Sequence, residues 1–325
     1  MARPNIGLNG RQPHLGWTAG SRRRSAWRYP ELFIAALMSC AVGAGSFAQA
    51  APAGTAKPAL RPLREIIVSY ADDSRKLQLY RINADGSARR RITDGTRDCS
   101  MPAWSPDWMK LVYAQESGGG NALWLSTPDG ENPQLLVGSG MNLVPSWLPD
   151  SKHIVWMTLT PETKPGAAGL LQIARRVLRI GKKPATSSRL HIMNTQTRQS
   201  RPLFSDPEQM KFSNLMPAVS PDGAKVAFVS DRGGKLRIWS SNLDGSAAEP
   251  VSPVSAESDE RLQLPIEQKV PSWSPDGRWI AHWEGVEMDH MSPFTGKSDP
   301  QRDALIEGTW NVWVVGRDGK NKRKE

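Results

Sequence analysis

The sequence predicts an all-β fold, a β-propeller built from repeated four-stranded blades, and three observations support this prediction. A six-residue segment that ends in Pro-Asp recurs along the chain, and a short apolar segment follows each copy. Glycine (28 residues) and proline (26 residues) are frequent, which indicates many turns and therefore many short strands. The chain also holds 13 Trp against 4 Tyr and 6 Phe, so a repeated structural position favours an indole ring.

The recurring segment has the pattern Pro-x-Trp-Ser-Pro-Asp or a close variant of it. Its copies are residues 102–107, 145–150, 217–222 and 271–276. The second proline of each copy stands at position 106, 149, 221 or 275, so the spacings are 43, 72 and 54 residues. A spacing of 43 residues matches one four-stranded propeller blade, and the longer spacings indicate insertions.

The apolar segment after each copy predicts a second strand, and a third strand that usually ends in Asp-Gly follows. The second strands are expected at residues 111–114, 154–157, 226–229 and 280–283. A first unit lacks the recurring segment but keeps the later strands, at residues 66–68, 79–82 and 91–93. Five repeats are therefore visible. The final residues, 320–325, are too polar to predict a last strand.

The residues of the recurring segment have local structural roles. Proline fixes φ, Asp hydrogen-bonds its own backbone and Gly permits positive φ, so Pro-Asp-Gly favours a tight hairpin turn. The expected turn formers are Asp107, Asp150, Asp222 and Asp276. The expected wedges between neighbouring blades are Trp104, Trp147 and Trp273. Burial of one such ring stabilises a fold by roughly 2–3 kcal/mol.

These motifs resemble the TolB-like propeller repeat, in which Pro-x-Trp-Ser-Pro-Asp-Gly is followed by an Ile-Ala-Phe-x-Ser strand. The resemblance covers residues 64–325 and departs from the pattern at Val219, which replaces the Trp, and at Trp108 and Ser151, which replace the Gly. It concerns the propeller alone, because the α/β domain that precedes the propeller of TolB itself has no counterpart here. The family usually has six blades, so a five-bladed ring, a degenerate sixth blade and a truncated chain all remain open.

The first fifty residues have the composition of an export signal. Residues 32–50 are apolar or small, Arg22, Arg23, Arg24 and Arg28 precede them, and Ala-Gln-Ala ends them. This pattern predicts a signal peptide over residues 1–50 with cleavage between Ala50 and Ala51. A linker over 51–63 and the propeller over 64–325 follow, and the expected location is periplasmic or secreted. The alternatives are an uncleaved anchor and a lipoprotein attached through Cys40.

An insertion at residues 158–188 separates the second and third strands of the third unit. Within it, residues 170–180 show helical spacing, with an apolar face opposite Arg175, Arg176 and Arg179. We interpret this segment as a helix packed on its own propeller, whose three arginines offer a binding surface. A helix that docks a partner and a helix on a membrane surface are the alternatives.

Residues 282–290 hold two His and three carboxylates, which are possible Zn²⁺ or Mn²⁺ ligands. The candidates are His282, Glu284, Asp289 and His290, of which the first two stand at the end of a predicted strand and the others in a loop. We interpret the segment as a solvated polar loop that leaves a blade, and we predict neither a metal nor another cofactor. Cys40 lies in the signal segment, so Cys99 has no partner for an internal disulfide. No Gly-x-Ser-x-Gly elbow, Walker loop or His-Glu-x-x-His helix occurs.

Two classes of function follow from these observations. The net charge is +10, but the basic residues do not form the clustered stripe of a nucleic-acid-binding fold. The signal segment is too rich in small residues for a permanent membrane span. The main hypothesis is an exported, non-enzymatic scaffold that binds a protein, peptide or glycan partner in the bacterial envelope. The alternative is a glycan-processing or hydrolytic propeller enzyme that uses His and carboxylate side chains near the channel mouth.

Overall fold

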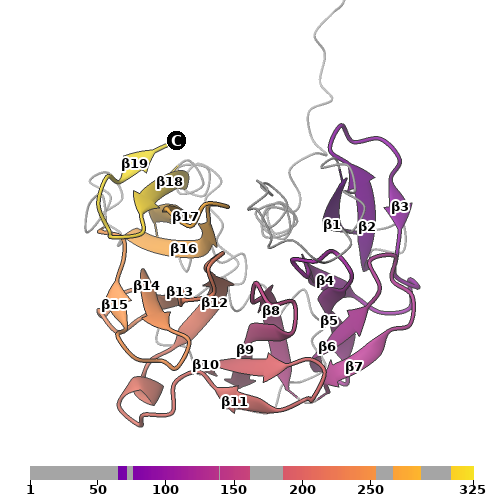
Figure 1. Cartoon of the computed structure of the whole chain (residues 1–325), viewed down its shortest axis with the longest axis horizontal. Coiled ribbons are helices and arrows are strands. Elements are labelled where there is room, and N and C mark those ends of the chain that lie inside the picture. The colour runs from indigo at the N-terminus through magenta and orange to yellow at the C-terminus, as the bar shows by residue number, and fades with distance from the viewer. Residues whose placement is uncertain (1–64, 72–75, 139, 162–185, 254–265, 287–308) are drawn as a thin grey trace, which may run out of the picture. The chain divides into compact units, whose positions relative to one another are not determined.

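The computed structural model describes residues 65–71, 76–138, 140–161, 186–253, 266–286 and 309–325, all within one unit of the chain, Glu31–Glu325 (Figure 1). Every regular element among them is a β-strand, apart from one 3-10 turn, η1 (Gln209–Lys211). The all-β class predicted from the sequence is therefore confirmed. No helix in this part of the chain is long and apolar enough to cross a membrane.

The strands group into five successive units, which we number 1 to 5. Unit 1 contains β1 (Glu65–Ala71), β2 (Leu77–Asn83) and β3 (Arg90–Arg91). Unit 2 contains β4 (Cys99–Trp104), β5 (Leu111–Ser117), β6 (Gly120–Ser126) and β7 (Gln134–Val137). Unit 3 contains β8 (Met141–Trp147), β9 (His153–Pro161), β10 (Thr186–Asn194) and β11 (Ser200–Pro202).

The last two units have the same plan. Unit 4 contains β12 (Asn214–Val219), β13 (Lys225–Ser230), β14 (Arg237–Asn242) and β15 (Glu249–Pro250). Unit 5 contains β16 (Ile266–Trp273), β17 (Trp279–Val286), β18 (Asn311–Gly316) and β19 (Arg323–Lys324). In every unit the strands pair antiparallel in chain order, and one parallel pair, Asn121 with Met141, links the sheets of units 2 and 3. Five repeated antiparallel sheets are the blade pattern that the sequence predicts.

The first strand of units 2 to 5, which we call the inner strand, carries a bulge immediately before the proline of the recurring segment. The pairing register shifts within β4, β8, β12 and β16. The residue before the proline has positive φ in each case: Met101 (53°), Val144 (51°), Met216 (51°) and Val270 (55°). Positive φ is uncommon for a residue other than glycine and is a true outlier for the β-branched Val144 and Val270, so the same unfavourable conformation occurs four times.

The core lies between the sheets. One cluster of buried apolar side chains extends from unit 2 to unit 5, and a smaller cluster joins unit 1 to unit 2. The second strands are buried on both faces, as the runs Ile154–Met157 and Val226–Val229 show. Such strands have continuous apolar sequences because neighbouring sheets cover both sides.

The tryptophans that recur in the inner strands lie between neighbouring units. Trp147 of unit 3 is 7% exposed, and its indole N–H donates to the Ala103 carbonyl of unit 2 at 2.9 Å. Trp273 of unit 5 is half-buried and donates in the same way to the Ala218 carbonyl of unit 4 at 3.0 Å. Trp104 is buried in the smaller cluster and contacts Trp108, with ring centroids 4.7 Å apart.

The Asp residues of the recurring segment hold its turn. In unit 4 the Ser220 hydroxyl donates to Asp222 at 2.6 Å, and the Ala224 amide donates to the same carboxylate at 3.0 Å. The pairs Ser105–Asp107 and Ser274–Asp276 repeat this arrangement, whereas Asp150 accepts from the Lys152 and His153 amides. These are the local bonds expected of turn-forming carboxylates.

Two details of the sequence interpretation need correction. Strands β9 and β10 pair from His153 with Asn194 to Pro161 with Thr186, so both ends of the predicted 158–188 insertion belong to strands. The predicted helix at 170–180 lies outside the described residues. At the other end of the chain, Arg323 and Lys324 pair with Val314 and Trp313 although the segment is polar, because backbone groups alone form that pairing.

Candidate functional site

The inner strands of units 2 to 5 converge on one apolar pocket with a volume of about 80 Å³. Each strand contributes its positive-φ residue and the proline that follows: Met101–Pro102, Val144–Pro145, Met216–Pro217 and Val270–Pro271. Because proline has no backbone N–H, the bulge leaves no additional donor facing the pocket. The walls therefore combine apolar side chains with small residues, and the pocket suits one or two short apolar side chains.

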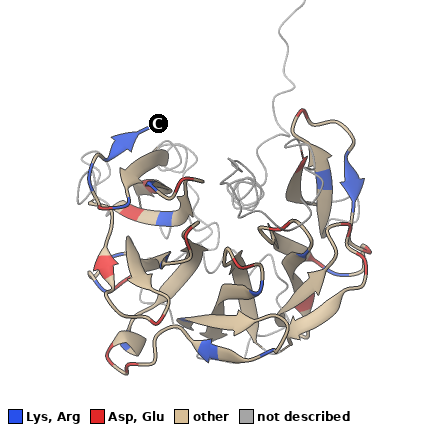
Figure 2. Cartoon of the chain, in the orientation of Figure 1, with Lys and Arg blue, Asp and Glu red and all other residues tan. Residues whose placement is uncertain are grey.

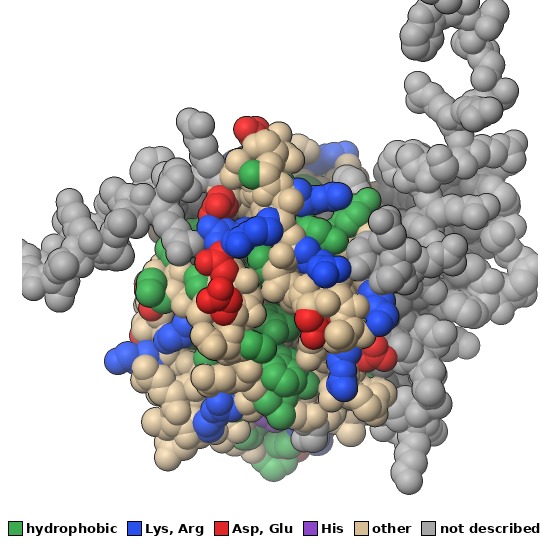
Figure 3. Space-filling model, turned by 90° about the vertical axis from the view of Figure 1, so that its right-hand side faces the viewer, with side chains coloured by type: hydrophobic (Ala, Val, Ile, Leu, Met, Phe, Trp, Pro, Cys, Tyr) green, Lys and Arg blue, Asp and Glu red, His purple; other side chains and the backbone are tan. Residues whose placement is uncertain are grey.

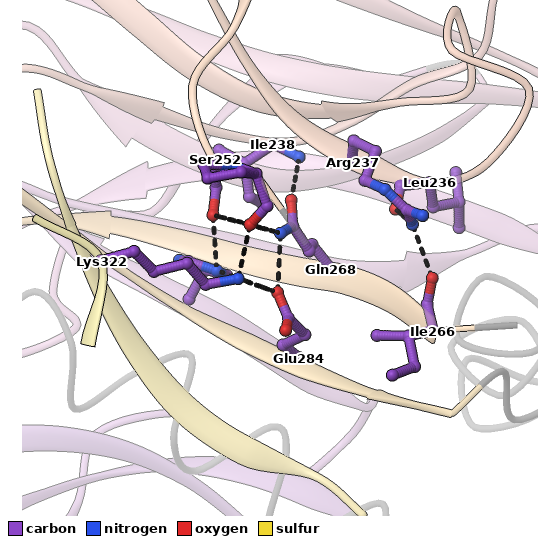
Figure 4. A network of polar contacts seen from close by, with 10 residues as sticks. Leu236, Arg237, Ile238, Ser252, Ile266, Gln268, Glu284 and Lys322 are labelled. Carbon is purple, nitrogen blue, oxygen red and sulfur yellow. Dashed lines mark hydrogen bonds and ion pairs between the residues drawn. The ribbon is translucent and has the colours of Figure 1, made fainter. Parts of the chain in front are cut away.

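A second feature is a buried polar network between units 4 and 5 (Figure 4). His282 and Glu284 lie on β17 with only 1% and 2% of their surface exposed. Gln268 of β16 donates its side-chain amide to Glu284 at 2.7 Å, and the Lys322 ammonium forms an ion pair with the same carboxylate oxygen. The Ser252 hydroxyl lies 3.1 Å from His282 Nε2, and that nitrogen lies 3.8 Å from the Glu284 carboxylate.

The strand register shows how unit 5 differs from its neighbours. The paired positions Gln268 and Glu284 correspond to Asn214 and Ser230 of unit 4 and to Asn142 and Thr158 of unit 3. The position two residues earlier on the same strand also differs. It holds the aromatic side chains Trp156 in unit 3 and Phe228 in unit 4, and it holds His282 in unit 5. Two positions that hold a small polar and an aromatic side chain in units 3 and 4 therefore hold ionisable side chains in unit 5.

Gln268 links the network to the preceding sheet. Its side-chain carbonyl accepts the backbone N–H of Ile238, on β14 of unit 4, at 3.0 Å. Asn142 makes the equivalent contact in unit 3, where its amide donates to the Asn121 carbonyl on β6 of unit 2 at 3.0 Å. These amide side chains join neighbouring sheets at buried edges, where a lost partner is costly.

Burial controls the protonation of this network. It lowers the pKa of His282, although the Glu284 carboxylate opposes the shift, so the imidazole is neutral at neutral pH. Burial also lowers the pKa of Lys322, and Glu284 again opposes the shift. The network then holds one balanced pair, Glu284 with Lys322, beside a neutral imidazole.

The network does not fit a divalent cation. The Glu284 carboxylate already accepts from the Lys322 ammonium and the Gln268 amide, and a second positive charge beside Lys322 would be repelled. The described residues contain no group of three His, Cys, Asp or Glu side chains suited to a metal. His282 and Glu284 lie on strand β17, as expected for the end of a strand, but both side chains are buried and not solvated as the sequence interpretation expects. Asp289 and His290 lie outside the described residues, as do Arg175, Arg176 and Arg179 and the cleavage residues Ala50 and Ala51.

Sequence reasoning missed most of this network. Lys322, Gln268 and Ser252 meet only because strands β16 and β17, the segment after β15 and the segment before β19 come together. A second buried pair, Lys269 with Glu267 at 3.0 Å, lies on β16, and the Lys269 ammonium is 5.1 Å from the centre of the Trp310 ring. The available signal was the run Glu267-Gln268-Lys269, which places charges on a strand that is mainly apolar in units 3 and 4.

Comparison with known proteins places these features in context. No family model matches the chain. The chain is 25% identical over 240 residues to dipeptidyl-peptidase 5 of Porphyromonas endodontalis, which covers 68% of this chain and 34% of that protein. It is 30% identical over 95 residues to the Tol-Pal system protein TolB of Desulfosudis oleivorans, which covers 29% of this chain and 21% of that protein. The matches thus span 34% of the first relative and 21% of the second.

Solved structures match over most of the chain. The putative TolB from Agrobacterium tumefaciens has a TM-score of 0.56 at 17% identity and covers 80% of this chain and 76% of its own. TolB from Acinetobacter baumannii has a TM-score of 0.54 at 16% identity and covers 81% and 52%. An oligogalacturonate lyase in complex with manganese has a TM-score of 0.51 at 16% identity and covers 80% and 61%.

At identities this low, the structural matches establish the fold alone. Together with the repeated segments they define the class of protein, which is an all-β propeller. More particularly, the chain carries the TolB-like propeller repeat. The prediction that the chain is not an enzyme does not stand, because the relative matched over 240 residues is by name a peptidase, and the same fold occurs in a lyase.

Proposed function

We propose that this chain is an exported propeller that acts in hydrolytic peptide processing and binds peptide chains at the pocket of its inner strands. The similarity to dipeptidyl-peptidase 5 carries this proposal, since it extends over 240 residues and 68% of the chain. The substrate class that follows from that name is peptides.

The pocket supports the proposal because its chemistry suits peptide side chains. Val144 and Val270 are half-buried and Met101 is half-buried beside them, so the walls are apolar yet reachable from solvent. Concave apolar sites with a few polar groups are the common form of a binding site. The strained backbone at all four bulges also favours a functional role, since strain often marks ligand-binding regions.

The cellular setting belongs to the same proposal. Residues 1–50 form the signal peptide, cleavage between Ala50 and Ala51 releases residues 51–325, and the mature chain meets its partners in the bacterial envelope. The arginines before the apolar run and the Ala-Gln-Ala site support this location. Mass spectrometry of the protein from cells should find Ala51 at the amino terminus, and an intact Met1 or a lipid on Cys40 would contradict it.

A fluorescent library of short apolar peptides tests the binding claim, and chromogenic dipeptide substrates test hydrolysis. Oligogalacturonate represents the alternative class of ligand. Val144→Asp places a charge in the pocket, and because Asp tolerates positive φ better than Val, the variant should fold normally. Leu135→Asp is the matched control, since Leu135 is 44% exposed on β7 outside the pocket.

We expect peptide binding by the parent chain and the control, and at least tenfold weaker binding by Val144→Asp, which corresponds to about 1.4 kcal/mol. Binding of oligogalacturonate with no binding of peptides would replace the proposed substrate class. Equal peptide binding by all three proteins would remove the pocket from the proposal.

A further inference from the structure

The interface between units 3 and 4 lacks the tryptophan that lies at the interfaces on either side of it. Trp147, Val219 and Trp273 are each the last residue of an inner strand, and all three hold the same place in the pairing register. Trp147 and Trp273 each donate an indole N–H to the preceding unit. The side chain of Val219 is smaller than an indole and has no N–H, so this interface is less filled and has one hydrogen-bond donor fewer.

The residue that faces this position from the preceding unit differs as well. Ala103 and Ala218 supply the carbonyls that accept from Trp147 and Trp273. The equivalent residue at the interface between units 3 and 4 is Ser146, which precedes the wedge of unit 3 as Ala103 precedes the wedge of unit 2. An alanine therefore faces each of the two tryptophans, whereas a serine faces the valine.

Ser146 offers a hydroxyl proton and a carbonyl lone pair to a ligand. Its Oγ accepts the Val219 backbone N–H at 3.1 Å, so the hydroxyl proton points elsewhere and has no acceptor among the described residues. Its carbonyl receives no indole N–H, because Val219 holds the place of the tryptophan. A carbonyl oxygen has two lone pairs, so pairing within the sheet leaves one of them open. Ser146 is half-buried and lines the pocket, so a ligand can reach both groups.

The strands around Ser146 are uncharged, which indicates a neutral ligand group. β8 and β12, the inner strands that meet at this interface, hold no Lys, Arg, Asp or Glu, and both are tan in Figure 2. On the side of the molecule that Figure 3 shows, by contrast, basic and acidic side chains lie among hydrophobic ones. A neutral donor and a neutral acceptor on one residue complement one residue of an extended peptide, whose N–H and C=O point to the same side.

We propose that Ser146 and Val219 form a subsite of the pocket, the Ser146 subsite, which recognises the backbone of one residue of an extended apolar peptide. The Ser146 hydroxyl donates to the C=O of that residue, and the Ser146 carbonyl accepts its N–H. The side chain of the peptide residue packs against Val219, where an indole lies at the neighbouring interfaces. This inference rests on the proposed function, since it names the group of the peptide that the pocket recognises.

The central test rebuilds the neighbouring interfaces at this position. The double variant Ser146→Ala with Val219→Trp recreates the alanine–tryptophan pairs on either side, so it should fold, and the added burial should raise the thermal midpoint by roughly 2–4 °C. The probe is a fluorescently labelled Gly-Ala-Val-Ala-Gly peptide, which the double variant should bind at least tenfold more weakly than the parent chain. Val312→Trp is the matched control and should bind the probe as the parent does, because Val312 is 36% exposed on β18 outside the pocket.

Two further measurements separate the hydrogen bonds from the shape of the subsite. Ser146→Ala alone should weaken probe binding roughly fivefold through the loss of one hydrogen bond, whereas Ser146→Thr keeps the hydroxyl and should bind the probe as the parent chain does. A probe with an ester in place of the valine N–H should bind the parent chain roughly fivefold more weakly than the amide probe. The double variant should not distinguish the two probes, because its indole N–H already occupies the carbonyl of residue 146.

The outcomes distinguish this inference from the proposed function. If Val144→Asp weakens probe binding but the double variant binds the probe as the parent chain does, the inference is overturned and the pocket remains the peptide site. Equal binding of the ester and amide probes by the parent chain also overturns it, because the peptide N–H then makes no bond to Ser146. If the parent chain binds neither this probe nor any other member of the apolar peptide library, the proposed function fails and the inference fails with it.

Discussion

Lys322 and Glu284 form an ion pair in which the Lys322 side chain is 10% exposed and the Glu284 side chain is 2% exposed. Removal of one partner leaves an uncompensated buried charge, so Glu284→Gln or Lys322→Met should lower the free energy of unfolding by about 3–5 kcal/mol. The double variant removes both charges and should recover most of that loss. Urea denaturation of the four proteins measures the coupling, and additive losses in the double variant would show that the two charges act independently.

His282 should make the stability of the fold fall in mildly acidic solution. Burial lowers its folded-state pKa below 6.5, so below that pH the unfolded chain binds a proton that the folded chain does not. The stability is therefore fully present above pH 6.5 and is lost as the pH falls. His282→Phe, which restores the aromatic of units 3 and 4, should flatten this slope between about pH 7 and pH 5.

A second acidic window belongs to the turn carboxylates. Partial burial raises the pKa of Asp222, but donors from Ser220, Ala224 and Arg317 outweigh it and hold the value at about 2. Its contribution is thus present at pH 4 and above and is lost only as the pH falls toward 2. Urea midpoints between pH 7 and pH 3 separate the two windows, and a slope in the upper window that survives His282→Phe would exclude His282 as its cause.

The wedge tryptophans should contribute according to their burial. Trp147→Ala should destabilise the fold by about 3–5 kcal/mol through a cavity between units 2 and 3. Trp147→Phe keeps much of the ring but loses the bond to the Ala103 carbonyl, so about 1 kcal/mol is expected. Trp273→Ala should cost less, because Trp273 is half-buried. Equal thermal midpoints for the parent chain and Trp147→Ala would show that Trp147 is not buried between the two units.

Cys99 should be inert in the folded protein. Burial raises the pKa of its thiol to about 12, against the weaker effect of a hydrogen bond from Gln115. The thiolate that reacts with disulfide reagents is therefore scarce at pH 8. Labelling of the mature chain should proceed only at the rate of unfolding and should become fast in urea. Rapid labelling under native conditions would mean that unit 2 opens locally.

The sequence predicts the parts of this molecule that depend on short-range patterns. Trp147 and Asp222 recur at fixed places in a repeated segment, so their positions beside and within a turn follow from the period alone. The network around Glu284 depends on contacts between residues 38 positions apart, Glu284 and Lys322, which no local pattern encodes. The strand that holds His282 was predicted at residues 280–283, but the burial of His282 was not, because a polar run indicates a solvated segment unless the contacts that cover it are known.

The pocket was not predicted either. Its walls come from a backbone conformation, positive φ at Met101 and Val144, that residues of these types rarely adopt. The repeated proline marks each bulge in the sequence, but only the structure shows the register shift and the four bulges around one pocket.

Photo-crosslinking of a bound peptide to the mature chain tests the central claim most directly. A photoreactive apolar peptide that the chain binds should label residues 101–102, 144–146, 216–218 and 270–272, the four inner-strand bulges that line the pocket. Val144→Asp should abolish the labelling, and Leu135→Asp should retain it. Labels confined to the outer strands, or labelling that Val144→Asp leaves unchanged, would contradict a peptide-binding role for the pocket.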